Sequence, residues 1–187
     1  MTDAKPEQDR RVLKTKTSLR DAMLALMVPR GWDDMTIQEI CDKANVGRST
    51  FYMHYRSKDE LLLDGLNDLR DMISPPTAQA TGPGFPFLPG LLAHMAEQRQ
   101  VFNAAIGRRS GHGVARQFKK MVRQLVEIEL ERRPHRTNLP WVATFVAGGI
   151  VEAMAWWVDA PDPPPIADLA RSLDALARAA LAPSPRS

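Results

Sequence analysis

Apolar residues recur every three or four positions along most of this 187-residue chain, which is the period of an α-helix with one buried face. Near the N-terminus the apolar positions are Val12, Leu19, Met23, Leu26 and Met27. Pro29 should end this first helix, because proline has no amide hydrogen and disfavours helix at the residue before it. Gly31 then permits the chain to reverse its direction.

Two more helices are predicted from matching start signals. Thr36 with Glu39, and Ser57 with Glu60, have the S/T-x-x-E spacing of a capping box, in which each side chain covers a backbone amide of the other. The first signal opens a helix over 36–44 with Ile37, Ile40, Cys41 and Ala44 on one face. The second opens an amphipathic helix over 57–73 whose apolar residues are Leu61, Leu62, Leu66, Leu69 and Ile73.

Between these helices lie a turn, residues 45–47, and a short predicted helix, residues 48–55 with the sequence RSTFYMHY. Phe51 and Tyr55 are four residues apart and therefore share one side of that helix. We expect them to be buried together with Val46.

The second half of the chain also has helical periodicity. Residues 74–90 contain five prolines and three glycines and are predicted to be a linker. Helices are expected over 91–107 (as one helix or two), 113–133, 139–159 and 163–182. In 113–133 the expected buried stripe is Val114, Phe118, Met121, Leu125 and Ile128.

The predicted fold is therefore all-α. Residues 10–73 form an N-terminal domain that includes the connecting helix 57–73. Residues 74–90 form the linker, and residues 91–183 form a helical C-terminal domain. The apolar run 142–158 is shorter than the roughly 20 residues of a membrane span and contains Glu152. We interpret it as a buried helix.

Charge and cysteine usage narrow the classes of function. The net charge is +3, and residues 1–73 hold 12 Lys or Arg against 13 Asp or Glu. Overall charge therefore gives no argument for nucleic-acid binding, and the positions of the cations must decide. The single cysteine, Cys41, excludes an intramolecular disulfide and is expected to be a buried apolar residue. This usage favours a cytoplasmic protein.

The helix over 36–44, the three-residue turn and the helix over 48–55 together form a helix-turn-helix motif. In this motif the second helix enters the major groove of DNA by its N-terminal end. Arg48 can bind guanine through two hydrogen bonds, Thr50 can contact a base, and Tyr52 or His54 can donate to phosphate. The exposed side chains available to DNA are then Arg48, Ser49, Thr50, Tyr52 and His54.

Residues outside the short helix are expected to hold the DNA backbone. Thr36 and Lys58 lie at helix N-termini, where backbone amides and the helix dipole favour a phosphate. A basic segment through Lys14 and Lys16 is placed to contact the flanking backbone.

At these residues the chain resembles the TetR family of bacterial transcriptional regulators. The matching sequence is MTIQEICDKANVGRSTFYMHYRSKDELL, residues 35–62. The segments NVGRSTFYMHY and FVAGGIVEAMAWWV resemble the subgroup that contains regulators of dihydroxyacetone kinase operons. The family resemblance implies an all-helical homodimer that binds double-stranded DNA at a palindromic operator, and a C-terminal domain that binds a small-molecule inducer. The DNA contacts it implies are Thr36, Arg48, Ser49, Thr50, Tyr52, His54 and Lys58.

The C-terminal half offers candidates for an inducer pocket. They are Phe102, Phe118, Met121, Trp141, Phe145, Glu152 and Trp156. Trp141, Phe145, Glu152 and Trp156 have the spacing of one helical face. A carboxylate in apolar surroundings is costly unless it is paired, so Glu152 faces either a partner subunit or a polar spot in a ligand cavity.

The sequence shows no metal-ligand spacing among its histidines and no set of nucleophile, base and orienting acid. We therefore expect neither a metal, a cofactor nor an enzyme. The prediction is a repressor that an inducer releases from its operator, with dimerisation through the last two helices. The alternative is a DNA binder of the same fold that is constitutive or controlled by a protein.

Overall fold

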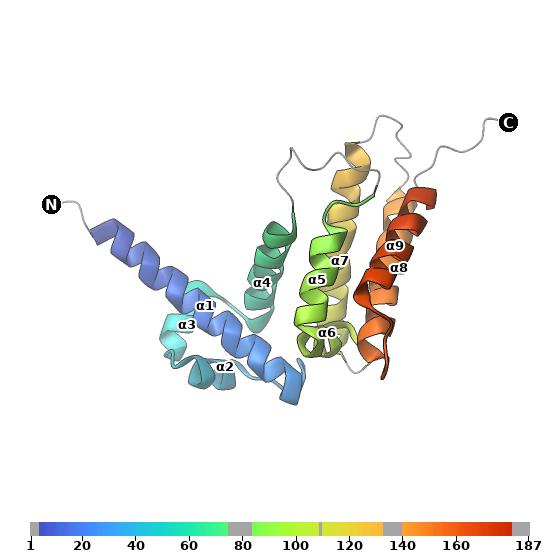
Figure 1. Ribbon diagram of the computed structural model, residues 1–187. Helices are drawn as coiled ribbons and strands as arrows, with labels where there is room; N and C mark the ends of the chain where they lie inside the picture. Colours follow the sequence, from blue (N-terminus) through green and yellow to red (C-terminus); the bar gives the residue numbers. More distant parts are fainter. Residues whose placement is uncertain (1–3, 75–83, 109, 133–139, 181–187) are drawn as a thin grey trace. The chain divides into compact units, whose positions relative to one another are not determined.

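The computed structural model describes residues 4–74, 84–108, 110–132 and 140–180. It divides into two compact units, residues 1–65 and 66–187. Every regular element in the described part of the chain is a helix (Figure 1), so the predicted all-α fold is confirmed. The division falls inside helix α4, eight residues before the predicted domain boundary at 73. Residues 75–83, 109, 133–139 and 181–183 of the predicted segments lie outside the described residues.

The first unit contains α1 (Ala4–Arg30), α2 (Ile37–Ala44), α3 (Arg48–His54) and the start of α4 (Lys58–Ile73). Its core is made of apolar side chains from all four helices and from the loop between α1 and α2, each almost fully buried. The largest of them are Leu19, Met23, Met27, Met35, Ile40, Phe51 and Leu61. These residues include the predicted stripe of α1, except that Val12 is exposed and Leu26 is half-buried.

Helix α1 does not stop at Pro29 but continues to Arg30. Pro29 has no amide hydrogen to donate and its ring crowds the carbonyl four residues back, but only Arg30 follows it in the helix. The next residue, Gly31, has φ 76°, a left-handed conformation that glycine adopts without strain. Its amide donates to the carbonyl of Met27 over 3.0 Å, which closes the helix.

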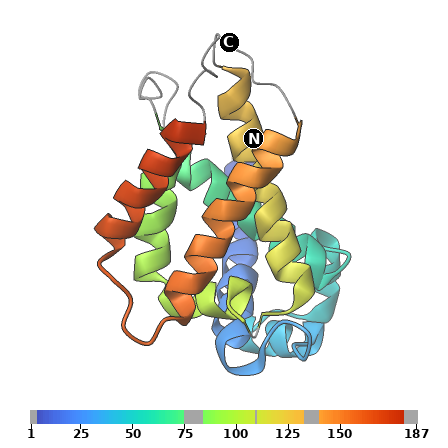
Figure 2. The same cartoon turned by 90° about the vertical axis from the view of Figure 1, so that its right-hand side faces the viewer.

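The second unit contains α5 (Leu88–Glu97), α6 (Arg99–Ile106), α7 (His112–Glu131), α8 (Pro140–Asp159) and α9 (Ile166–Ala180). Helix α8 packs against α6, α7 and α9, and α9 packs against α5. Figure 2 looks onto α8 and α9, which lie side by side. The predicted region 91–107 is two helices, with a break at Gln98.

The predicted linker 74–90 ends too late. Helix α5 begins at Leu88, and its proline lies in the first turn, where an amide would have no partner within the helix anyway. Phe85 and Phe87 are each 2% exposed and belong to the core of the second unit. Proline and glycine content alone therefore placed the end of the linker too late. Phe85 and Phe87, which precede α5, are already part of the core of the second unit.

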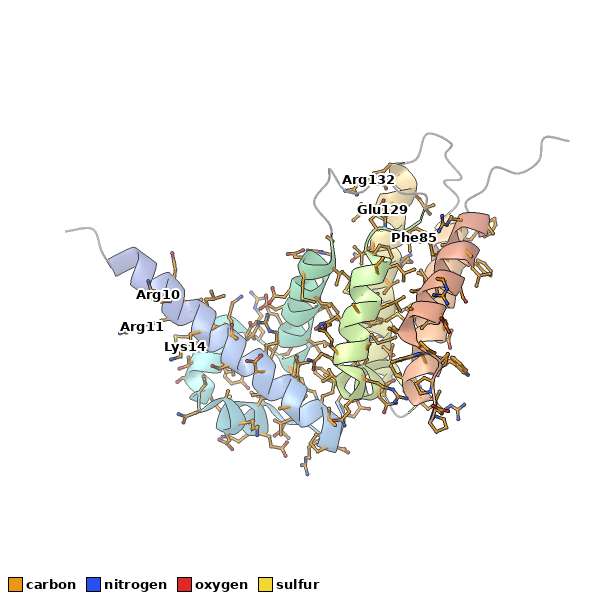
Figure 3. The ribbon with its side chains drawn as sticks, in the orientation of Figure 1. Arg10, Arg11, Lys14, Phe85, Glu129 and Arg132 are labelled. Atoms are coloured by element: carbon orange, nitrogen blue, oxygen red, sulfur yellow. The ribbon has the colours of Figure 1, made fainter. Side chains whose placement is uncertain are left out.

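The buried stripe of α7 also differs from the prediction at its C-terminal end. Ile128 is 41% exposed, whereas Glu129 is 8% exposed. The Glu129 carboxylate accepts a hydrogen bond from Arg132 over 2.8 Å, and Figure 3 shows the two side chains near the C-terminal end of α7. This ion pair supplies the partner that a buried carboxylate requires.

Helix α8 is long and apolar enough to cross a membrane by length and composition, but half of that segment is buried inside the structure. The helix is therefore not buried all round, and its remaining face is exposed. We define the outer face of α8 as Trp141, Phe145, Gly149, Glu152 and Trp156, which lie on the exposed side and are spaced three or four residues apart.

Candidate nucleic-acid interface

The turn before α3 is built by local hydrogen bonds. Asn45 ends α2 in the left-handed conformation, with φ 53° and ψ 46°, which asparagine tolerates better than most residues. Its amide donates to the carbonyl of Asp42 over 3.2 Å, and the amide of Val46 donates to that of Cys41 over 3.0 Å. Helix α3 then begins at Arg48, so the predicted helix, three-residue turn and short helix are confirmed.

One side of α3 is fixed to the core of the unit. Phe51 is 0% exposed and Tyr55 3%, and their ring centres are 5.8 Å apart. Cys41 is 1% exposed, and burial raises the pKa of its thiol, as expected of a packing residue rather than a reactive one. The predicted burial of these three side chains is confirmed, and Val46 is half-buried.

The opposite side of α3 presents the predicted contact residues to solvent. Arg48, Ser49 and Tyr52 are exposed, and Thr50 and His54 are half-buried. The Arg48 guanidinium lies 5.8 Å from the centre of the Tyr52 ring and donates to the Tyr52 hydroxyl over 3.4 Å. This hydrogen bond raises the pKa of Arg48. The pair places a permanent charge beside an aromatic hydroxyl at the start of the helix.

Thr36 is an exposed residue that also closes the first capping box. Its hydroxyl oxygen accepts from the amide of Glu39 over 3.2 Å, and its own amide donates to the Glu39 carboxylate over 2.9 Å. The backbone hydrogen bond from Thr36 lowers the pKa of Glu39. The predicted box is therefore confirmed, and it holds the N-terminus of α2 at the surface.

The second capping box forms on one side only. Ser57 accepts from the amide of Glu60 over 3.3 Å, but the Glu60 carboxylate accepts from the amide of Arg56 over 2.6 Å. Glu60 thus reaches one residue further back than the motif predicts, and α4 is still capped at its first turn.

The predicted phosphate contact of Lys58 is not supported by its geometry. The Lys58 ammonium donates to the carbonyls of Trp32, Met35 and Asp33 over 2.7, 2.8 and 3.3 Å. It also lies 5.0 Å from the centre of the Trp32 ring. An ammonium has three hydrogens to donate, and these three carbonyls can accept all of them. Lys58 therefore holds the α1–α2 loop to the start of α4.

A second fastening joins three helices around Asp64. The Tyr55 hydroxyl, just beyond α3, donates to the Asp64 carboxylate on α4 over 2.6 Å. Lys16 on α1 lies 3.5 Å from the same carboxylate and 5.3 Å from the centre of the Tyr55 ring. Lys16 was predicted to contact flanking DNA, but its ammonium is directed to this cluster. We call Lys16, Tyr55 and Asp64 the Asp64 cluster.

Sequence reasoning missed the roles of Asp64 and Lys58 because both depend on how helices pack. Asp64 lies nine residues from Tyr55 and 48 from Lys16. No local spacing links such residues. The one available signal is Tyr55 itself, because a buried tyrosine hydroxyl needs a hydrogen-bond partner.

The structure separates the seven predicted pocket residues into two groups. Phe102, Phe118 and Met121 are 2–5% exposed and lie in the core of the second unit, where the rings of Phe102 and Phe118 meet edge to face at 5.7 Å. The other four belong to the outer face of α8. Trp141, Phe145 and Trp156 are 63%, 71% and 57% exposed, which contradicts a place in the wall of an interior pocket.

The chain shares its N-terminal sequence with known regulators. Residues 19–64 match the family model described as bacterial regulatory proteins, tetR family. A segment of 55 residues is 42% identical to YxbF of Bacillus subtilis (strain 168), an uncharacterised HTH-type transcriptional regulator. That match covers 29% of this chain and 14% of YxbF, so it concerns one domain.

Solved structures extend the similarity of fold to both units. A TetR transcriptional regulator from Streptococcus agalactiae 2603V has a TM-score of 0.68 at 23% identity, covering 91% of this chain and 97% of that one. The dihydroxyacetone kinase operon activator DhaS has 0.63 at 17%, covering 88% and 94%. Thermus thermophilus FadR, solved with lauroyl-CoA, has 0.57 at 21%, covering 92% and 100%.

Tyr55→Phe should lower the free energy of unfolding by about 1–2 kcal/mol at neutral pH, because Asp64 loses its hydroxyl donor. Burial and the hydrogen bond to Asp64 raise the pKa of Tyr55 above its ordinary value of 10.0. The unfolded chain therefore releases this proton first, so the stabilisation is complete below pH 10 and is lost as pH rises above it.

Urea unfolding of Tyr55→Phe and wild type at pH 8–11 tests this expectation. The alkaline loss of stability should be smaller in Tyr55→Phe than in wild type. Tyr52 is the other tyrosine of the chain and is 49% exposed, so Tyr52→Phe should keep the wild-type pH dependence. An equal alkaline loss in Tyr55→Phe and wild type would contradict the role of the Asp64 cluster.

Lys58→Met should lower the free energy of unfolding by about 1–3 kcal/mol, because three carbonyls lose a charged donor. Lys43, an exposed lysine on α2, provides the control Lys43→Met, which should leave the urea midpoint unchanged. Equal midpoints for the two variants would show that the loop does not depend on Lys58.

Proposed function

We propose that this chain, whose residues 19–64 match the TetR family model, is a transcriptional regulator of that family, and that it represses transcription from a palindromic operator until a small-molecule inducer releases it. The observation that carries DNA recognition is α3: one face is fixed by Phe51 and Tyr55, and the other presents Arg48 and Tyr52 beside each other. A rigidly held helix with an exposed cationic and polar face fits the major groove.

The proposed DNA contacts are divided by role. Arg48, Ser49 and Thr50 occupy the first turn of α3, which enters the groove and can reach base edges. Tyr52 and His54 are placed to donate to phosphates on either side of it, whereas the Thr36 amide and hydroxyl both already donate to the Glu39 carboxylate. Lys58 is left out of this set, because its ammonium is already engaged by loop carbonyls.

A second copy of the chain is the proposed occupant of the outer face of α8. Trp141, Phe145 and Trp156 are all more than half exposed there, and α9 beside it exposes Leu176 by 66%. Large apolar side chains gathered on one surface mark an interface. Gly149 lies among them, and a Cβ atom added to it would meet nothing within 4 Å, so another helix can approach closely at this point. Two-fold pairing would supply two α3 helices for an inverted repeat.

Helix α4 is the proposed route of the inducer response. Asp64 at its middle is bound to Tyr55 beside α3, whereas Leu66, Leu69 and Ile73 further along it pack against the core of the second unit. A ligand that favours one packing of that core would shift α4, and the Asp64 cluster would pass the shift to α3. The structure of FadR with lauroyl-CoA supports a ligand response in a protein of this fold.

The alternative is a cytoplasmic DNA binder of the same fold without an inducer. A closely packed core in the second unit would favour it, and the rings of Phe102 and Phe118 meet edge to face there. Thermal unfolding and DNA binding measured with a panel of small molecules separate the two. A ligand that raises Tm and weakens DNA binding supports induction. If no ligand in the panel has both effects, the alternative is supported.

Arg48→Ala and Tyr52→Ala should each weaken binding to a duplex that the wild type enriches from a random pool. Loss of a bidentate contact to guanine costs about 1–3 kcal/mol, so we expect roughly a tenfold to hundredfold loss for Arg48→Ala. Both residues are exposed, and Tm should be unchanged. Fluorescence anisotropy measures the affinity, and wild-type affinity in either variant would contradict its assignment.

Phe145→Asp combined with Trp156→Asp should convert the dimer to monomer, because two charges would have to be buried in an apolar interface. Ile128→Asp is the control, since Ile128 is also exposed in the second unit but lies on α7. Sedimentation velocity should find the control dimeric. A double variant that stays dimeric would place the interface elsewhere.

A further inference from the structure

One residue on the exposed side of α3 has no part in the proposed DNA contacts. Met53 is 72% exposed, the highest value among the exposed large apolar side chains in the described part of the chain. The proposed contacts on α3 all carry a hydrogen-bonding group or a charge, whereas Met53 offers only methylene groups and a thioether. Single apolar residues are common on protein surfaces, so its position on the helix must decide whether it has a role.

Met53 lies on the side of α3 opposite the core. It is two residues from Phe51 and therefore about 160° away from it around the helix. Phe51 is the side chain that fixes α3 to the core, at 0% exposure. Ser49, which is exposed, lies four residues before Met53 and shares its side of the helix. The most outward line of α3 is therefore made of Ser49 and Met53.

The other proposed contacts on α3 flank Met53. Tyr52 and His54 lie about 100° from it in opposite directions around the helix. Arg48 is bonded to Tyr52 and lies on the same flank. Thr50 lies on the flank of His54, and both are half-buried. An apolar side chain thus occupies the middle of a surface whose edges are polar and cationic.

We propose that Met53 recognises thymine in each half-site by packing against its C5 methyl group. The inference rests on the proposed function, because it requires α3 to lie in the major groove. The edges of the bases in that groove are mostly hydrogen-bond donors and acceptors, and the thymine methyl is the apolar group among them. An apolar side chain that covers a donor or acceptor instead leaves it without a partner, which is costly. Met53 would therefore select for thymine against the other bases.

The direction of the side chain suits this contact. Long side chains on a helix lean toward its N-terminus, which places the end of Met53 over the turn that holds Ser49 and Thr50. That turn is the part of the second helix that enters the groove, and it begins about 6 Å along the axis from Met53. Methionine is unbranched and flexible, so it adapts to an irregular apolar surface.

The test removes the methyl group alone. Deoxyuridine keeps the base pairing and the hydrogen-bonding groups of thymidine and lacks only the C5 methyl. In an operator that the wild type selects from a random pool, each thymine of the half-site, on either strand, is replaced in turn in both half-sites. Fluorescence anisotropy gives the affinity of wild type, Met53→Ala and Met72→Ala. Met72 on α4 is 59% exposed, so its variant is a control that removes an exposed methionine outside α3.

At one thymine position, wild type and Met72→Ala should lose affinity by roughly fourfold for each half-site, which is the value of one covered methyl group. Met53→Ala should bind the unmodified operator more weakly by a similar factor. The same variant should be insensitive to deoxyuridine at that position, because the two changes remove the same contact. Its Tm should equal that of wild type, since Met53 is exposed.

Three results would overturn the inference. Met53→Ala could be as sensitive as wild type to every replacement, the wild type could be indifferent to all of them, or the selected half-site could contain no thymine. Failure of the proposed function would look different, because wild-type protein itself would then select no operator.

Discussion

A helix of seven residues cannot hold its own shape in water, and the first unit is organised around that constraint. Isolated helices shorter than about 12–15 residues are marginal even with favourable sequences, and α3 runs only from Arg48 to His54. Its stability must come from contacts with the rest of the unit. Phe51 is fully buried in the core, and Asn45 closes the preceding turn. The Tyr55 hydroxyl donates a hydrogen bond to Asp64. The exposed face is thereby fixed in direction, which is what a reader of DNA requires.

Helix α4 contributes side chains to both units. Asp64 connects α4 to the end of α3, and Lys58 connects its first turn to the α1–α2 loop. Beyond Asp64, the last turns of α4 contribute to the core of the second unit. In the proposed inducer response, α4 would carry a change of packing in that core to the contacts that hold α3.

Local chemistry explains which features the sequence could predict. The Thr36–Glu39 capping box and the turn at Asn45 depend on residues within a few positions of one another, and the buried side of α3 follows from the four-residue spacing of Phe51 and Tyr55. Lys58 and Lys16 were expected to contact DNA, but their partners are 23–26 and 48 residues away, and helical periodicity does not show such pairs. The spacing of Trp141, Phe145, Glu152 and Trp156 correctly places them on one face. Spacing alone could not show whether that face points inward or out.

The central claim is that two copies of α3 read DNA together, and sequencing the duplexes that the purified protein selects from a random pool tests it most directly. We expect an inverted repeat whose half-sites are centred about 34–36 Å apart, or a multiple of that helical turn. A pool that stays random, from protein shown to be folded and dimeric, would contradict it.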